Sequence, residues 1–191
     1  MQDKIPPQDL DAEQAVLGAM MISKDATAIV VGKLRTDHFY RPAHVHIFQA
    51  LLDLYRKNEP VDLVTVASEL KKQNKLEDAG GRTYLAEIIN SVPTAANAER
   101  YSQIVLEKAM ARKLIDAGST MISDAFDDGQ EIDGALEAAQ RALIDISKDH
   151  VQDQFVKIDS VLKTVFDDIQ SIYDSKGEKL LGVPSGFKDY D

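Results

Sequence analysis

The chain has 191 residues, of which 44% are hydrophobic, and its 32 acidic and 22 basic residues give a net charge of −10. A field of that sign repels phosphate backbones, which excludes direct nucleic-acid binding as the main task of this segment. The sequence contains no cysteine, which excludes disulfides and cysteine-based zinc sites, and no apolar run approaches the roughly 20 residues that span a bilayer. The composition therefore predicts a globular cytoplasmic protein whose partners are proteins.

The first part of the sequence, residues 1–94, predicts a globular domain made of short helices. After an arm at Ile5-Pro6-Pro7, Asp9 or Asp11 can cap a helix that ends near Met21. Further helices are expected at 26–34, from Pro42 to the turn at Asn58-Glu59-Pro60, from Asp62 or Thr65 to about Asn74, and at 84–90. Residues 61–66 are β-prone enough for a short strand to be an alternative, but the other periodicities favour an all-α fold.

Residues 95–148 predict an extended antiparallel helical hairpin. A helical pattern runs from Ala95 to about Phe126, and a polar turn at 127–130 separates it from a second helix. Apolar residues recur in that second helix at spacings of three and four. Two helices bury little by themselves, so we expect the hairpin to meet a second copy of the chain. The residues predicted to make this contact are Leu136, Leu143 and Ile146.

Residues 149–181 predict a linker that contains a separate amphipathic helix at about 158–175. The polar segment 147–155 before it is interpreted as a flexible connection. The apolar stripe of this helix needs a groove in which to be buried. Its predicted docking residues are Ile158, Val161, Leu162, Val165, Phe166 and Ile169. The Gly- and Pro-containing segment 182–191 then predicts the beginning of a further domain beyond this chain.

A pair of glycines suggests a nucleotide site and a run of acidic residues suggests a calcium site, but neither pattern has the residues that such a site requires. Gly129 and Gly134 have the glycine spacing of a P-loop, but Ala135-Leu136 stands where lysine and a hydroxyl residue must hold phosphate and Mg²⁺. The acidic residues at 124–133 lack the order of an EF-hand loop. No hydroxyl or carboxylate has a recognisable catalytic partner, so we expect no catalytic residue and no cofactor in this segment.

The histidines give a weak metal signal. His38, His44 and His46 lie near Asp37, but His44 and His46 are two residues apart on a helix and therefore point about 200° away from each other. We interpret them as helix-start and surface histidines and expect no metal site.

Five segments together resemble the amino-terminal region of bacterial replicative DNA helicases of the DnaB family. They are Ile5–Gly18, Glu59–Val66, Gly80–Leu85, Val92–Asn97 and Gly182–Asp191. The last is similar to the family's G-[IV]-x-T-G-[FY]-x-x-L-D at the start of its RecA-like motor domain. The resemblance covers essentially the whole chain.

The resemblance implies that this segment is the collar of a hexameric ring that unwinds the replication fork with ATP. ATP and Mg²⁺ would bind the motor domain, which would also make most of the DNA contacts. The collar would assemble from dimers and recruit DNA primase and a helicase loader, and the linker helix would pack on the motor domain of an adjacent subunit. We place the primase surface on the outer side of the hairpin's first helix and the short helix beside it, at Tyr84, Ile115 and Met121.

Two other interpretations remain open. The helicase-binding domain of a primase has a similar bundle and hairpin, but it should lack the segment 182–191. A stand-alone enzyme with an unrecognised site would need a cluster of perturbed ionisable groups in a pocket.

Overall fold

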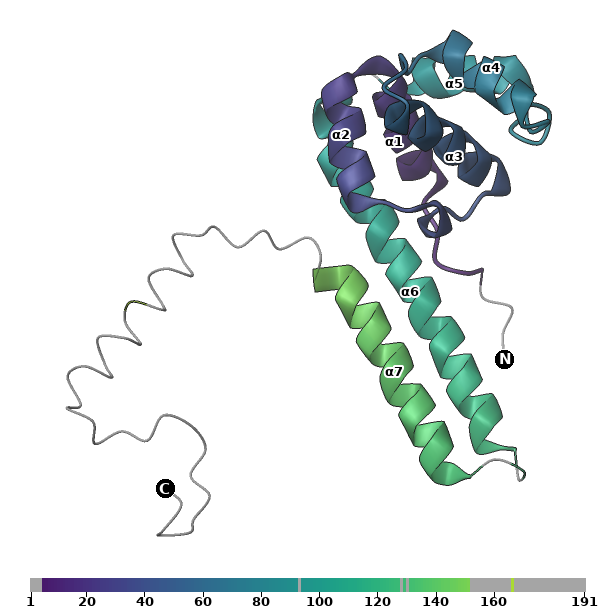
Figure 1. Cartoon of the computed structure of the whole chain (residues 1–191), viewed down its shortest axis with the longest axis vertical. Coiled ribbons are helices and arrows are strands. Elements are labelled where there is room, and N and C mark those ends of the chain that lie inside the picture. The colour runs from purple at the N-terminus through teal and green to yellow at the C-terminus, as the bar shows by residue number, and fades with distance from the viewer. Residues whose placement is uncertain (1–4, 93, 128, 130, 152–165, 167–191) are drawn as a thin grey trace. The chain divides into compact units, whose positions relative to one another are not determined.

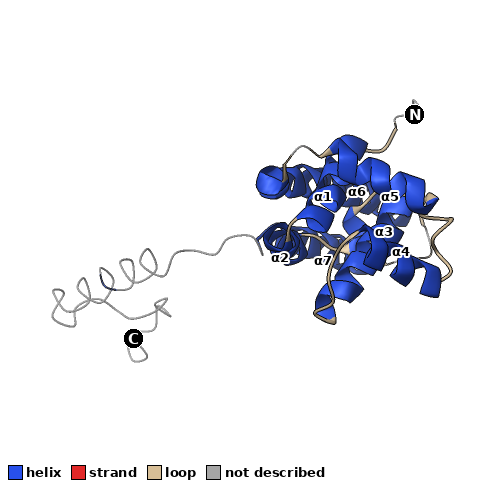
Figure 2. Cartoon of the chain, turned by 90° about the horizontal axis from the view of Figure 1, so that it is seen from above, coloured by secondary structure: helices blue, strands red, loops and turns tan. Residues whose placement is uncertain are grey.

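The computed structural model describes residues 5–92, 94–127, 129, 131–151 and 166. All regular secondary structure in these ranges is helical, which confirms the all-α prediction (Figures 1 and 2). The chain divides into units 1–152 and 153–191. The predicted linker helix and the segment 182–191 lie outside the described residues, apart from the exposed Phe166.

Five short helices form the head. They are α1 (Leu10–Ile22), α2 (Lys24–Lys33), α3 (Pro42–Arg56), α4 (Leu63–Lys72) and α5 (Gly81–Ser91), with a 3₁₀ turn η1 (Thr36–His38) between α2 and α3. Local sequence explains where several of them begin. Carboxylates cap α1 and α4, because Asp9 accepts a hydrogen bond from the Ala12 amide at 3.0 Å and Asp62 accepts from the Thr65 amide at 2.9 Å.

The region predicted as either strand or helix is helical from Leu63 onward. Asp62 and Thr65 form a reciprocal capping box, which satisfies amides at the start of α4 and so favours helix over strand. The next helix, α5, begins at Gly81, three residues before its predicted start, because Gly80 and Gly81 take positive φ values of 91° and 73° and turn the chain into it.

The core of the head is built around α1, which packs on α2, α3, α5 and α6. Its buried face carries Val16, Leu17 and Met20, all fully buried. Gly18 lies where α1 crosses α5. A Cβ at Gly18 would lie 2.5 Å from Val92 Cγ2 and 2.7 Å from the Ile88 carbonyl oxygen, so this crossing requires glycine.

Two long helices, α6 (Ala98–Ala125) and α7 (Ile132–Val151), form the predicted antiparallel hairpin (Figure 1). The buried residues of α6 all belong to its first half, which packs on the head. The second half extends beyond the head beside α7. None of the described helices is both long and apolar enough to cross a membrane.

The second hairpin helix is longer than its sequence pattern indicated. Residues 147–151, which we expected to begin a flexible connection, continue α7 to Val151. This stretch contains neither glycine nor proline, and polar residues do not by themselves stop helix propagation.

Candidate partner-binding surface

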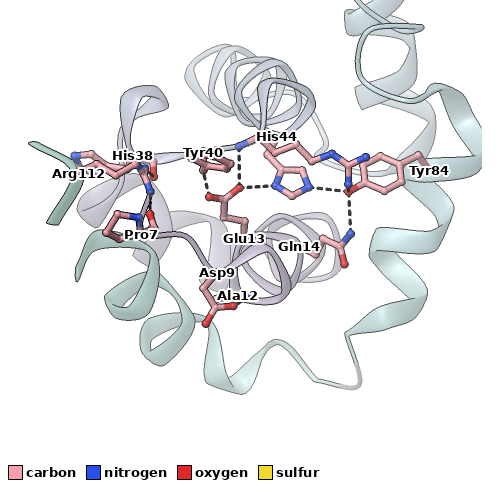
Figure 3. A network of polar contacts seen from close by, with 11 residues as sticks. Pro7, Asp9, Ala12, Glu13, Gln14, His38, Tyr40, His44, Tyr84 and Arg112 are labelled. Carbon is pink, nitrogen blue, oxygen red and sulfur yellow. Dashed lines mark hydrogen bonds and ion pairs between the residues drawn. The ribbon is translucent and has the colours of Figure 1, made fainter. Parts of the chain in front are cut away.

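Tyr84, a predicted partner contact on α5, has its hydroxyl at the centre of a polar network (Figure 3). The phenol oxygen lies 2.7 Å from His44 Nε2 and accepts hydrogen bonds from Gln14 Nε2 at 2.8 Å and Arg41 Nη1 at 2.9 Å. The Arg41 guanidinium carbon lies 4.8 Å from the centroid of the tyrosine ring. Gly80 permits this packing, because a Cβ there would lie 2.9 Å from three Tyr84 side-chain atoms.

The inner end of the network is the buried carboxylate of Glu13, which is only 2% exposed. It lies 2.6 Å from His44 Nδ1 and accepts hydrogen bonds from the backbone amides of Tyr40 at 2.7 Å and Arg41 at 3.4 Å. These amides precede α3, whose N-cap Arg41 makes no side-chain capping bond. Glu13 of α1 therefore caps α3 from outside that helix, where the helix dipole favours a negative charge.

Counting the hydrogen bonds around the Tyr84 oxygen gives the tautomer of a neutral His44. The phenol oxygen already accepts from Gln14 and Arg41, which fills its two lone pairs, so its own O–H must donate to His44 Nε2. The proton of the neutral imidazole then lies on Nδ1 and is donated to Glu13. The buried groups of Glu13 and His44 in this network therefore all have partners, as burial requires.

A second polar cluster fixes the hairpin to the head. Arg112 of α6 donates from Nη1 to the Pro7 carbonyl at 2.8 Å and from Nη2 to the His38 carbonyl at 2.7 Å. Its guanidinium lies 5.6 Å from the centroid of the Tyr40 ring. One side chain thus ties the N-terminal arm and η1 to the base of the hairpin, although Pro7 and Arg112 are 105 residues apart.

The neighbouring Lys113 contacts Asp37 with an Nζ–Oδ2 distance of 2.8 Å. Burial, the largest single influence, raises the pKa of Asp37, but the hydrogen bond from Lys113 and the charges of His38 and Lys113 outweigh it and lower the pKa overall.

The interpretation of the histidines as surface residues is wrong for two of them. His44 is fully buried and His38 is 3% exposed, while His46 is half-buried. His44 precedes the buried Ile47 and Phe48 by three and four residues, so it lies on the helix face that packs into the core. Within the described ranges no group of three or more His, Cys, Asp or Glu side chains is arranged to hold a metal ion.

The other predicted contact residues lie on the hairpin. Ile115 is 53% exposed and Met121 is half-buried. Met121 is six positions after Ile115 on α6, so their side chains point about 120° apart and do not share one face. Ile115 follows Arg112 by one helical turn, which places it near the head, whereas Met121 lies further along the hairpin.

Apolar side chains along the outer part of the hairpin remain exposed in the single chain. On α7, Leu136 and Leu143 are 57% and 46% exposed, and Ile146 is half-buried. Other large exposed apolar residues on the hairpin are Leu114, Ile122, Phe126, Ile132 and Ile144. Such a concentration of apolar surface is typical of a protein-binding face.

Glu13, His44, Arg41, Gln14 and Arg112 were not predicted as site residues, although the sequence carried a signal for two of them. Glu13 precedes Val16 and Leu17 by three and four residues, and His44 precedes Ile47 and Phe48 in the same way. Each polar residue therefore lies on the apolar face of its helix. A buried acid and a buried base each need a polar partner, so the sequence indicated that both side chains would be paired inside the fold, but not with which residue.

The described residues thus define a class of all-helical domain: a compact head with a protruding hairpin that leaves several large apolar residues exposed. Comparison with known proteins identifies the family. The profile of the DnaB-like helicase N terminal domain matches residues 5–107, and the chain belongs to that family.

The sequence similarity to known relatives extends over nearly the whole chain. The chain is 42% identical to the replicative DNA helicase DnaB of Mycobacterium leprae over 188 residues and 40% identical to the replicative DNA helicase DnaC of Bacillus subtilis over 191 residues. These alignments cover 97% and 100% of this chain but only 31% and 42% of the relatives.

Two solved structures share the fold. The N-terminal domain of DnaB helicase from Mycobacterium tuberculosis is 47% identical with a TM-score of 0.71, over 74% of this chain and 99% of that one. A DnaB-like replicative helicase, described together with its interactions with primase, is 28% identical with a TM-score of 0.64, over 95% of this chain and 40% of that one.

Proposed function

We propose that this chain is the N-terminal collar and linker of a hexameric replicative DNA helicase and that it serves ring assembly and partner recruitment. The family match and the exposed apolar residues of the hairpin support this proposal. ATP, Mg²⁺ and most DNA contacts then belong to the motor domain of a longer protein acting in the cytoplasm. The relatives have that additional length, since the chain spans 31% and 42% of two of them. The family match disfavours the alternative that the chain is a primase fragment.

Self-association through the hairpin is the part of the proposal that the exposed side chains support most directly. Leu136→Glu and Leu143→Glu should shift sedimenting mass toward that of one chain, because an unpaired charge buried in an interface is costly. Arg141→Gln changes the charge by the same one unit at an exposed side chain that points about 140° from Leu136 and 160° from Leu143 around α7, and it is the matched control. Lower thermal stability with unchanged mass would mean that α7 packs only within its own chain.

Primase recruitment is supported by a 28% identical helicase whose structure was described with its primase interactions, and we place it at Tyr84, Ile115 and Met121. Alanine at each position should weaken binding of the helicase-binding domain of primase, measured by calorimetry. Ile115 and Met121 point about 120° apart on α6, so their effects should be unequal. Unchanged affinity of the folded triple variant would refute this placement.

The linker helix at about 158–175 is proposed to dock on the motor domain of an adjacent subunit through Ile158, Val161, Leu162, Val165, Phe166 and Ile169. The exposed Phe166 is consistent with a docking role. Hydrogen exchange tests the proposal. Slow exchange of this segment in a monomeric sample of the 191-residue chain would show that the linker helix packs on its own chain and not on an adjacent subunit. Recruitment of a helicase loader also belongs to this proposal, and its contact surface is unassigned.

A further inference from the structure

The network beneath Tyr84 connects a partly exposed aromatic ring to a buried carboxylate through a single imidazole. His44 bridges the two, at 2.7 Å from the Tyr84 hydroxyl and 2.6 Å from Glu13. His44 is fully buried, whereas Arg41, which lies over the tyrosine ring, is exposed. The hydrogen bonds of this network therefore fix the Tyr84 hydroxyl, and with it Arg41, relative to the buried Glu13 carboxylate.

Stability alone is a weak reason for such an arrangement. A buried acid–base pair loses hydration that its mutual attraction only partly restores, and apolar residues of similar volume often stabilise a core as well or better. What an apolar residue cannot do is hold the Tyr84 hydroxyl. With three polar partners on its oxygen, the ring is held to one orientation.

Tyrosine and arginine are the side chains that most often dominate the energetics of protein interfaces. Tyr84 takes one Arg41 N–H, while a guanidinium has five. The exposed edge of Arg41 can therefore receive a carboxylate from a partner. Side chains that are already ordered lose less conformational freedom when a partner binds, which tightens binding by roughly three- to tenfold for one such residue.

We propose that His44 is a positioning residue for partner binding: it holds Tyr84, and through Tyr84 also Arg41, in the orientation that the partner meets. This inference rests on the proposed function, with the helicase-binding domain of primase as the partner. It assigns a role to a buried residue that no partner touches, and it adds Arg41 to the contact surface.

The two nitrogen atoms of His44 can be replaced separately. In His44→Asn the amide reaches the position of Nδ1 and can still bond Glu13, whereas in His44→Gln the longer side chain reaches the position of Nε2 and can still bond Tyr84. Each variant is made in the 191-residue chain, and affinity for the primase domain is measured with the melting temperature. His44→Asn should bind about tenfold more weakly, and His44→Gln within threefold of the unmodified chain.

Tyr84→Phe removes the hydroxyl but keeps the ring, so it should weaken binding as much as His44→Asn. Combining the two should cause no further loss, because both break the same contact. Tyr55→Phe, at a half-buried tyrosine of α3 outside the network, is the matched control and should bind normally.

Equal affinities of His44→Asn, Tyr84→Phe and the unmodified chain would overturn the positioning role if Tyr84→Ala still weakened binding. Unchanged affinity of folded Tyr84→Ala would overturn the placement of the partner on Tyr84 together with this inference. If His44→Asn does not fold, the positioning role is tested by the other two variants. Tyr84→Phe should then bind about tenfold more weakly and His44→Gln within threefold of the unmodified chain, and equal affinity of Tyr84→Phe and the unmodified chain would overturn the role.

Discussion

Gly18→Ala tests the packing at the centre of the head. The new methyl group would lie 2.5 Å from Val92 Cγ2 and 2.7 Å from the Ile88 carbonyl oxygen, and the latter belongs to the backbone of α5 and cannot rotate away. The two helices must therefore separate. Overpacking of this kind costs about 1–3 kcal/mol, and the upper part of that range applies because the obstacle is backbone. Alanine's better helix propensity returns about 1 kcal/mol.

The net loss of unfolding free energy should be about 1–2 kcal/mol, which lowers the melting temperature by roughly 2–8 °C in a domain of this size. Gly32→Ala is the matched control, since Gly32 is also helical but has no atom within 4 Å of its Cβ position. That control should gain about 0.5–1 kcal/mol. Calorimetric melting of both variants decides the question: if Gly18→Ala melts as high as Gly32→Ala, the close crossing of α1 and α5 is wrong.

Three further predictions concern polar contacts of the head. Asp62→Ala should lower the unfolding free energy in urea by about 1 kcal/mol, because it removes the cap of α4, while Asp62→Asn should retain most of it. Hydrogen bonds from Lys57 and Lys72 hold the pKa of Glu69 below its usual range, so their stabilisation is complete above about pH 4.3 and is lost as the pH falls further. Glu69→Gln should flatten this acid-side loss in melts taken between pH 3 and 6, and an unchanged pH dependence would argue against the contacts. Arg112→Lys should lower the unfolding free energy by about 1–2 kcal/mol, because lysine cannot bridge two carbonyls as the guanidinium does, and equal stability of the two proteins would contradict the bridge.

Local chemistry made the helices of the head predictable. Asp9, Pro42 and Asp62 each mark a helix start by satisfying or removing a backbone donor, and these signals need no knowledge of tertiary structure. The hairpin followed from apolar spacing on either side of a polar turn. The end of α7 was missed because a charged stretch without glycine or proline is compatible with both helix and coil.

The network at Tyr84 was not predictable in the same way. Its members Glu13, His44 and Tyr84 come from three helices that only the tertiary fold brings together. The sequence marks Glu13 and His44 as polar residues on apolar faces, but it does not give the direction in which either side chain points. The ring orientation of Tyr84 depends on that direction, so the positioning role of His44 required the structure.

The most direct test of the proposed collar function is the mass of the unmodified chain in solution, measured by sedimentation equilibrium over a range of concentrations. One chain has a mass of 21.1 kDa. Because the apolar residues of α7 are exposed in the single chain, we predict masses that are multiples of this value and that rise with concentration. A folded chain that stays at the mass of one copy at all concentrations would contradict the claim that the hairpin assembles the collar.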